Sequence, residues 1–466
     1  MKTHTRISTA SLTLALTAVG VSGVFAQARP YAMPGTALPV PSVPSVPSVP
    51  SAPSTPDTPP APAPAPGTLN RLFNTDLPEA LGNSRLSLDA RLRWEYADQD
   101  AVGGGPGPRH SNATTLRTRF GLTTGSFHGL QAMIEGENIT ALGPSHNYNA
   151  AGSNGQPDRT VIADPTTTEL NQAWVSYRRW DTTLKAGRQR LALDNHRFIG
   201  DVAWRQNMQT FDAVGLENKS LPDLTLYYAY LWDIHRVFGD VSGLPAANRD
   251  LDSDSHVVNA SWSGWKYGRL TGYSYLLDLE NDAPASRNLS TATYGASFAG
   301  HAPLSDTVTL GYRAEFAWQS DYGDSPLDYG TEYYNVEAGV TVKPVALGVG
   351  YEVLGSDNGQ GFKTPLATLH AFNGWADVFL NTPGNGLRDF YAFAQVSVLP
   401  DLPIRFVFHQ FHSETGGANY GQEYGVLATK RFGKHWLALA KYAHYVADEG
   451  PYANTERFWV EMNFTF

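Results

Sequence analysis

The stretch RLSLDARLRWEY, residues Arg85–Tyr96, alternates apolar and polar side chains along its whole length. The apolar positions are Leu86, Leu88, Ala90, Leu92, Trp94 and Tyr96, and the positions between them are Arg85, Ser87, Asp89, Arg91, Arg93 and Glu95. Because successive side chains of a β-strand point to opposite faces, this pattern makes one apolar face and one charged face. A membrane barrel turns such an apolar face to lipid and such a charged face to a wet lumen. The stretch therefore predicts a transmembrane β-strand.

The rest of the chain repeats this unit in about eighteen candidate strands of about ten residues, the length of a tilted strand that crosses a bilayer. Short connections such as Gly125–His128 and Lys343–Pro344 alternate with long ones such as Ala141–Thr167 and Gly355–Gly386. Short turns at one end and long loops at the other are typical of outer-membrane barrels. We therefore predict an all-β fold, a transmembrane antiparallel up-and-down β-barrel over residues 84–466.

Composition agrees with a barrel and excludes several other classes. The mature region has no run of about 18 apolar residues, so no membrane helix is expected there. Aromatic residues make up 12% of the chain, which suits the aromatic girdles of a barrel. A net charge of −10 argues against a nucleic-acid partner. The chain has no cysteine, which excludes disulfides, thiolate metal sites and cysteine nucleophiles. A large soluble β-protein is the alternative.

The N-terminal region predicts export. Residues 1–26 combine Lys2 and Arg6 with an apolar stretch and a small-residue cleavage site before Gln27, which is typical of a secretory signal peptide. Residues 27–67 form a Pro-rich linker, whose composition favours an extended, disordered spacer. This arm is either a plain spacer or a contact to the cell wall. Residues 68–83 form an entry segment before the barrel.

The last strand, RFWVEMNFTF at Arg457–Phe466, also alternates and ends in an aromatic residue. A free apolar edge of this kind is an aggregation hazard, so we expect it to close against Arg85–Tyr96. Its terminal Phe466 resembles the signal that the outer-membrane assembly machinery recognises. The alternative is an ordinary last edge strand.

Alternation assigns charged side chains to the lumen. The predicted pore-lining residues are Arg85, Arg91, Arg93, Arg117, Arg119, Glu135, Glu137, Arg188, Arg313 and Arg405. Arginines concentrate on the first two strands, where their planar donor groups would guide an acidic solute. The alternative is a structural ladder, in which Glu135 and Glu137 pair with Arg117 and Arg119.

The long loop Gly355–Gly386 is rich in apolar residues for a connection, so we expect it to fold inward as a constriction. Its candidate residues are Phe362, His370, Trp375 and Asp377. The alternative is a loop that packs outside the pore. The sequence has no nucleophile elbow and no HExxH pattern, so we expect no catalytic site, cofactor or metal.

Two stretches resemble the alginate export family of outer-membrane barrels: LKAGRQRLALDNHRFIGDVAWRQNMQTFDAVGL at Leu184–Leu216, and GYEVLGSDNGQGFKTPLATLHAFNGWADVFLNTPGNGLRD at Gly350–Asp389. The resemblance implies an eighteen-stranded monomeric barrel in the outer membrane. In the first stretch, the residues expected to hold loop Leu191–Thr210 against the wall are Gly187, Arg188, Arg197, Trp204, Arg205 and Asp212.

The leading hypothesis is a passive outer-membrane channel for anionic solutes, with an exported acidic polysaccharide such as alginate as the candidate. Arg91, Arg93, Arg117 and Arg119 would form the attracting path. One alternative is an uptake porin for small nutrients. The other is a structural barrel whose Pro-rich arm contacts the cell wall.

Overall fold

The computed structural model describes residues 71, 75–102, 107–241, 244, 249–279, 284–399 and 401–466. The predicted signal peptide and Pro-rich linker lie outside the described residues, as does part of the entry segment. The described part of that segment contains helix α3 (Leu77–Gly82). Its Ala80 carbonyl accepts a hydrogen bond from the Gly125 amide at 3.0 Å, so α3 packs on the turn between the second and third strands.

An 18-stranded antiparallel sheet contains most of the described residues. Its first half is β1 (Arg85–Gln99), β2 (Ser111–Thr123), β3 (Leu130–Ala141), β4 (Thr167–Arg179), β5 (Thr182–Gln189), β6 (Thr210–Asn218), β7 (Leu224–His235), β8 (Asp250–Trp265) and β9 (Gly268–Leu277). Its second half is β10 (Thr291–Pro303), β11 (Val308–Asp321), β12 (Gly330–Val342), β13 (Val345–Leu354), β16 (Leu387–Leu399), β17 (Leu402–His412), β18 (Asn419–Phe432), β19 (Trp436–Ala447) and β20 (Thr455–Thr465).

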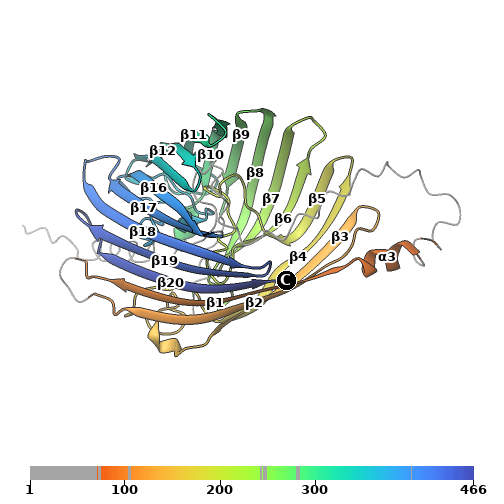
Figure 1. The fold of residues 1–466 in the computed structure, drawn as a ribbon, viewed down its shortest axis with the longest axis horizontal. Helices are drawn as coiled ribbons and strands as arrows, with labels where there is room; N and C mark the ends of the chain where they lie inside the picture. Colours follow the sequence, from red (N-terminus) through yellow and green to blue (C-terminus); the bar gives the residue numbers. More distant parts are fainter. Residues whose placement is uncertain are drawn as a thin grey trace, which may run out of the picture.

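The sheet closes on itself. Strand β1 pairs with β2 on one side and with β20 on the other, so that Arg93 lies opposite both Thr115 and Glu461. The Phe466 amide continues this seam with a 2.9 Å hydrogen bond to the Leu88 carbonyl. Every other strand pairs with its neighbours in chain order (Figure 1). The predicted up-and-down barrel is therefore confirmed, and closure leaves no free strand edge.

The connections differ in length at the two ends of the barrel. At one end, which we call the short-turn end, the connections include residues 180–181 and 343–344. At the other, the long-loop end, they include residues 142–166 and 355–386. The described start of the chain and the C-terminus both lie at the short-turn end, as an even number of strands requires. Short helical elements sit in the long loops: η2 (Ser145–Asn147), α5 (Pro284–Arg287) and η3 (Leu369–Ala371). No helix in the described part of the chain is long and apolar enough to span a membrane.

The two faces of the wall follow the alternation in the sequence. On the outer face, Phe120 and Val336 are both 57% exposed, whereas inward-facing Arg117 is fully buried. Exposed aromatic rings lie near both ends of the outer wall. At the short-turn end these are Trp180, Trp265, Phe432 and Trp436, and at the long-loop end Trp232, Tyr294, Trp318, Tyr351 and Phe390. This apolar wall between two aromatic belts is the surface that a bilayer requires.

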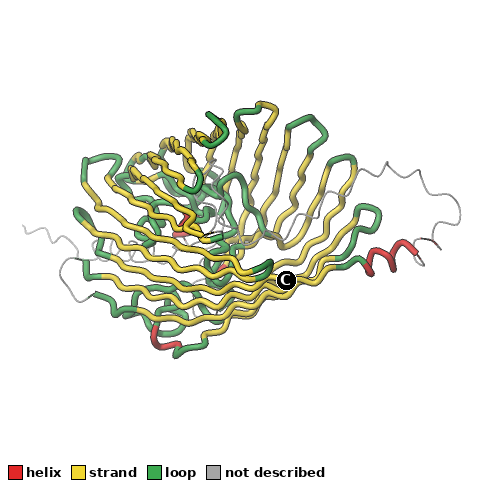
Figure 2. Tube along the Cα trace, in the orientation of Figure 1, coloured by secondary structure: helices red, strands yellow, loops and turns green. Residues whose placement is uncertain are grey.

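Two long connections fold into the barrel rather than away from it. We name them the first inner segment, residues 190–209 between β5 and β6, and the second inner segment, residues 355–386 between β13 and β16. Loop segments lie within the space that the strands enclose (Figure 2). The main apolar core forms there, where Phe198 of the first segment and Phe362 of the second pack against Tyr333 of the wall. Residues of these loops thus occupy much of the lumen, and Asp194 of the first segment reaches Arg269, next to the short turn 266–267, at 2.8 Å.

Glycines in β13 make room for large inward-facing rings of β16. Gly350 lies opposite Tyr391, and a Cβ added at Gly350 would lie 2.1 Å from Cζ of the Tyr391 ring. We expect Gly350→Ala to destabilise the barrel by about 1–3 kcal/mol, the usual effect of overpacking. The temperature at which the folded barrel loses its compact gel mobility measures the change. Gly272→Ala in β9 is the matched control, because nothing lies within 4 Å of the position that its new methyl group would take, and an equal loss of stability in both variants would contradict the prediction.

Candidate functional site

Four arginines on the inner faces of β1 and β2 form one cluster. The arginine cluster consists of Arg91, Arg93, Arg117 and Arg119, which are 1%, 0%, 0% and 4% exposed. Register places Arg91 directly opposite Arg117. Like charges on facing strands repel, so each guanidinium group needs acceptors close by.

Arg91 and Arg93 take most of their acceptors from the first inner segment and from β20. The Arg91 Nη1 donates to the carbonyl oxygens of Ala203, Trp204 and Arg205 at 3.1, 2.7 and 3.2 Å. Arg93 donates through Nε to Glu461 Oε1 at 2.8 Å, and its guanidinium carbon lies 4.1 Å from the ring centre of Trp204. These two arginines therefore join β1 and β20, the strands that close the barrel, to the first inner segment.

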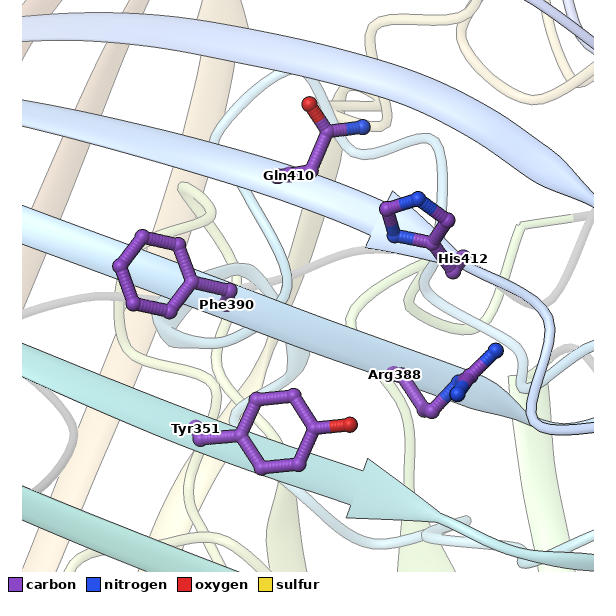
Figure 3. A pocket seen from close by; sticks show the side chains of 5 residues that line it. All are labelled: Tyr351, Arg388, Phe390, Gln410 and His412. Atoms are coloured by element: carbon purple, nitrogen blue, oxygen red, sulfur yellow. The ribbon is translucent and has the colours of Figure 1, made fainter.

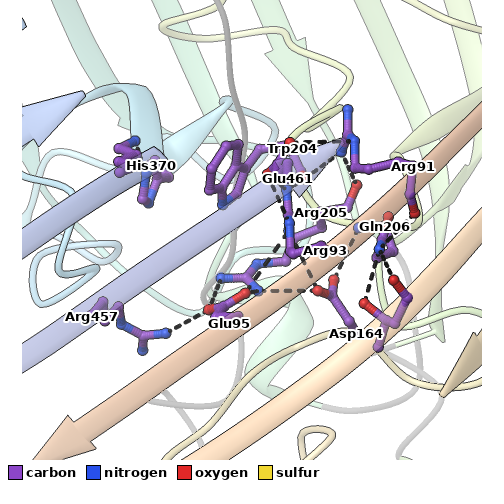
Figure 4. A network of polar contacts seen from close by, with 12 residues as sticks. Arg91, Arg93, Glu95, Asp164, Trp204, Arg205, Gln206, His370, Arg457 and Glu461 are labelled. Carbon is purple, nitrogen blue, oxygen red and sulfur yellow. Dashed lines mark hydrogen bonds and ion pairs between the residues drawn. The ribbon is translucent and has the colours of Figure 1, made fainter. Parts of the chain in front are cut away.

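Glu95 lies at the centre of a second set of ion pairs (Figure 4). Arg205 of the first inner segment binds it with both terminal nitrogens, at 2.8 and 3.1 Å, and Arg457 of β20 adds a contact at 3.2 Å. Asp164, from the loop between β3 and β4, lies 3.4 Å from Arg93 and 3.5 Å from Arg205. Side chains from β1, from β20, from the first inner segment and from the loop between β3 and β4 thus share one buried charge network.

Burial and pairing act in opposite directions on the loop members of this network. Burial alone lowers the pKa of Arg205, but the carboxylates of Glu95 and Asp164 raise it above its ordinary value. Burial alone raises the pKa of Asp164, but Arg205 and Arg93 lower it below its ordinary value. Both groups are therefore charged at neutral pH.

Arg117 and Arg119 contact carboxylates of their own wall. Arg117 pairs with Asp89, and Arg119 pairs with Glu137 of β3. Arg119 also donates to the Gln206 carbonyl of the first inner segment at 3.2 Å. Within the described residues, Nε and Nη1 of Arg117 have no hydrogen-bond acceptor.

The two glutamates predicted beside these arginines therefore have different partners. Glu137 is paired with Arg119, as the structural alternative proposed. Glu135 instead accepts hydrogen bonds from Asn171 and Gln172 of β4, at 2.6 and 2.9 Å.

Arg313 and Arg405 also face inward, in different surroundings. Arg313 binds Asp194 of the first inner segment at 2.6 Å and Glu315 of its own strand at 2.7 Å. Arg405 lies 3.8 Å over the ring of Phe393 and is in no ion pair among the described residues. Arg85, at the start of β1, is exposed at the short-turn end.

Arg188 is a correction to the predicted pore lining. It pairs with Asp212 at 2.9 Å, and its neighbours Gln189 and Phe211 are the buried, inward residues at this level. Arg188 and Asp212 therefore lie on the outer face, where His235 also contacts Asp212 at 3.0 Å. The physical reason is alternation: Arg188 directly precedes the inward-facing Gln189 in the same strand, so the two side chains point to opposite faces.

The predicted constriction residues are all buried inside the barrel. Phe362, His370 and Trp375 are 0%, 1% and 4% exposed, and the Asp377 side chain is fully buried. His370 bonds Asp377 through Nδ1 and Lys441 of β19 through Nε2, and its ring stacks on Trp204 at 5.3 Å. The Lys441 ammonium lies 4.0 Å from the ring centre of Trp375. The second inner segment is thus tied to the wall and to the first segment.

Backbone contacts and a further arginine join the two inner segments directly. The Gly200 amide donates to the Leu366 carbonyl at 2.8 Å, and the Thr368 amide donates to the His196 carbonyl at 3.0 Å. Arg197 binds Glu352 of β13 at 2.8 Å and Asn373 of the second segment at 3.0 Å. The two segments therefore form one packed unit inside the lumen.

Sequence reasoning found some members of this site and missed others. Arg197, Trp204 and Arg205 hold the first inner segment to the wall, as expected from the quoted motif. Asp164 and Lys441 were not predicted. Lys441 had a signal, because it is the one charged residue on the inward face of β19, whereas Asp164 lies in a loop without periodicity.

The profile of the alginate export family matches residues 83–355, more than half of the chain. The chain belongs to the alginate export family. The match includes the first quoted stretch, Leu184–Leu216, and ends shortly after the second one begins. The family and the closed barrel support an outer-membrane channel, embedded in the bilayer through its apolar outer face. The short-turn end then faces the periplasm and the long-loop end faces outward.

Solved structures show the same fold. OccAB2 of Acinetobacter baumannii superposes with a TM-score of 0.65 at 14% identity, covering 83% of this chain and 98% of that chain. OccK9 (OpdG) of Pseudomonas aeruginosa gives a TM-score of 0.65 at 14% identity, covering 83% of this chain and 100% of that chain. At this identity the likeness concerns the fold alone. No curated protein matches the chain.

Arg205 tests how the first inner segment is held. We expect Arg205→Met to weaken its docking by about 3–5 kcal/mol, because Glu95 and Asp164 lose a buried partner. A nitroxide at Ala192→Cys reports the motion of the segment, since Ala192 is exposed and the chain has no native cysteine. Arg109→Met, which breaks an exposed pair with Asp158, is the control and should leave the label unchanged. An immobile label in the Arg205 variant would contradict this role.

Acid should release the first inner segment. Burial alone raises the pKa of Asp194, but Arg313 of the wall lowers it below its ordinary value of 3.8. Since the docked pKa is below the free value, this carboxylate stabilises docking above about pH 4, and its contribution is lost as the pH falls through the docked pKa. We expect the Ala192→Cys label to stay immobile from pH 7 to about 4 and to become mobile below that. Release on raising the pH instead would overturn this assignment.

Proposed function

We propose that the channel passes anionic solutes, with an exported acidic polysaccharide such as alginate as the leading candidate. The observation that carries the proposal is a surplus of cationic donors on the inner wall. Arg117 has two nitrogens without an acceptor, and Arg405 has no carboxylate partner among the described residues. Family membership adds support, because the family is described by alginate export.

The first inner segment occupies donors that an anion could use. Arg91, Arg93 and Arg119 donate to backbone carbonyl oxygens of residues 203–206, which are neutral acceptors. A carboxylate makes hydrogen bonds with guanidinium groups roughly twice as strong as a neutral carbonyl does. A polyuronate that reaches this level would therefore compete with the segment for the same arginines.

Uptake of small nutrients is the second candidate function. The observation that favours it is the packed core that the two inner segments form inside the lumen, which leaves less room for a polymer chain. The two candidates differ in what blocks the current: an added polyuronate in the first, small organic acids in the second. Cell-wall contact through the Pro-rich arm and recognition of Phe466 by the assembly machinery stay predictions.

Planar-bilayer recording of the refolded protein under a KCl gradient tests the proposal. We expect a reversal potential that reports anion preference, and block by polyuronate added on the periplasmic side. Replacing Arg91, Arg93, Arg117 and Arg119 together by Ala should abolish the preference and raise the conductance, because the first inner segment also loses its anchors. Arg109→Ala, in an exposed loop, is the matched control.

Arg405→Gln provides a second test that breaks no ion pair among the described residues, in case the fourfold variant does not fold. It should reduce anion preference and leave the conductance unchanged. Cation preference of the unaltered protein would overturn the proposal for anionic solutes.

A further inference from the structure

A groove of about 440 Å³ lies on the outer wall, far from the lumen site, and is lined by Tyr351, Arg388, Phe390, Gln410 and His412. These side chains come from three adjacent strands, β13, β16 and β17, and Figure 3 shows them standing on the same side of the sheet. Register pairs Tyr351 with Phe390, Phe390 with Gln410, and Arg388 with His412. The groove is therefore built by the wall itself and not by a loop.

The groove spans the boundary between the apolar wall and the outer headgroup layer. Tyr351 and Phe390 are 37% and 42% exposed and belong to the aromatic belt of the long-loop end. Arg388 lies two residues beyond Phe390 toward that end, and His412 is the last residue of β17. An aromatic belt marks the membrane–water interface, so Arg388 and His412 are at the level of the lipid headgroups of the outer leaflet.

Arg388 has unused donors at this position. Its Nε donates to the Ser413 carbonyl at 2.8 Å, and it forms no ion pair with any described residue. The nearby carboxylate of Glu414 instead accepts a hydrogen bond from the Ser356 hydroxyl at 2.8 Å. An arginine without a carboxylate partner at the edge of the bilayer is suited to bind a phosphate with two parallel hydrogen bonds.

We propose that this groove binds the phosphorylated sugar headgroup of a glycolipid in the outer leaflet. Arg388 takes the phosphate, His412 adds a second polar contact, and Gln410 faces the sugar hydroxyls. Tyr351 and Phe390 form the apolar floor beneath, where the sugar ring and the first part of the acyl chains lie. A free phosphate would use only the polar groups, whereas the lipid uses both halves of the groove. The inference depends on the outer-membrane location and not on which solute the channel passes.

Native mass spectrometry of the purified barrel titrated with diphosphoryl lipid A tests the proposal. We expect Arg388→Ala with His412→Ala to weaken binding by about tenfold or more, the loss of charge-assisted hydrogen bonds. Phe390→Ala should also weaken binding, because the apolar floor is removed. Lys266→Ala is the matched control: it removes a cation beside the aromatic Tyr267 at the opposite end of the wall and should have no effect.

Two further arms decide the ligand. Dephosphorylated lipid A should bind the unaltered protein as weakly as diphosphoryl lipid A binds the double variant, and inorganic phosphate should not compete. The compact gel mobility of each variant shows that the barrel is folded. Equal binding of phosphorylated and dephosphorylated lipid would overturn the proposal, as would binding that the double variant retains. Arg388-dependent binding of inorganic phosphate alone would identify an anion site and not a lipid site. Because channel conductance is not measured, these outcomes are independent of the transported solute.

Discussion

The structure depends on the need of buried arginines for acceptors. Alternation turns Arg91, Arg93, Arg117 and Arg119 inward, and the closed barrel places Arg91 directly opposite Arg117. A guanidinium group taken out of water without partners is strongly unfavourable, and most of the acceptors of Arg91 come from a loop and not from the wall. Glu461 of the last strand supplies acceptors for Arg93, and residues 203–206 of the first inner segment supply them for Arg91 and Arg119. Closure of the barrel and folding of the first inner segment thus both supply acceptors to the same arginines.

The ion pairs and hydrogen bonds of the inner segments connect parts of the chain that are far apart in sequence. Arg205 reaches Glu95 on β1, while Arg197 reaches Glu352 on β13 and Asn373 in the second inner segment. The two segments also share backbone hydrogen bonds at Gly200 and Thr368. Moving either segment alone would expose apolar core and leave charges without partners. The inner segments are therefore expected to leave the lumen together, which makes opening of the lumen a cooperative event.

Local rules in the sequence determine the wall, and long-range pairing determines the site. The period of two in Arg85–Tyr96 is enough to predict the strand, its faces and its aromatic end, because each depends only on neighbouring residues. It cannot show that Arg91 meets the carbonyl of Trp204, since that contact depends on how a loop folds. Arg188 shows the limit of assigning a face from charge alone. Its charge led to the prediction that it lines the lumen, but its position in the alternation and its pairing with Asp212 place it on the outer face.

The same side-chain type has opposite roles on the two faces of the wall. Inside, Arg91 and Arg93 are surrounded by fixed acceptors, and a solute gains access to them only in competition with the protein's own carbonyl and carboxylate groups. Outside, Arg388 stands beside an aromatic belt with one backbone acceptor, and the remaining partners must come from the surroundings. The low dielectric of the interior makes each inner pair strong but costly to exchange, whereas a headgroup layer exchanges partners easily. The proposed anionic solute would therefore have to exchange with the pairs at the inner segments, whereas the proposed lipid contact at the outer wall needs no such rearrangement.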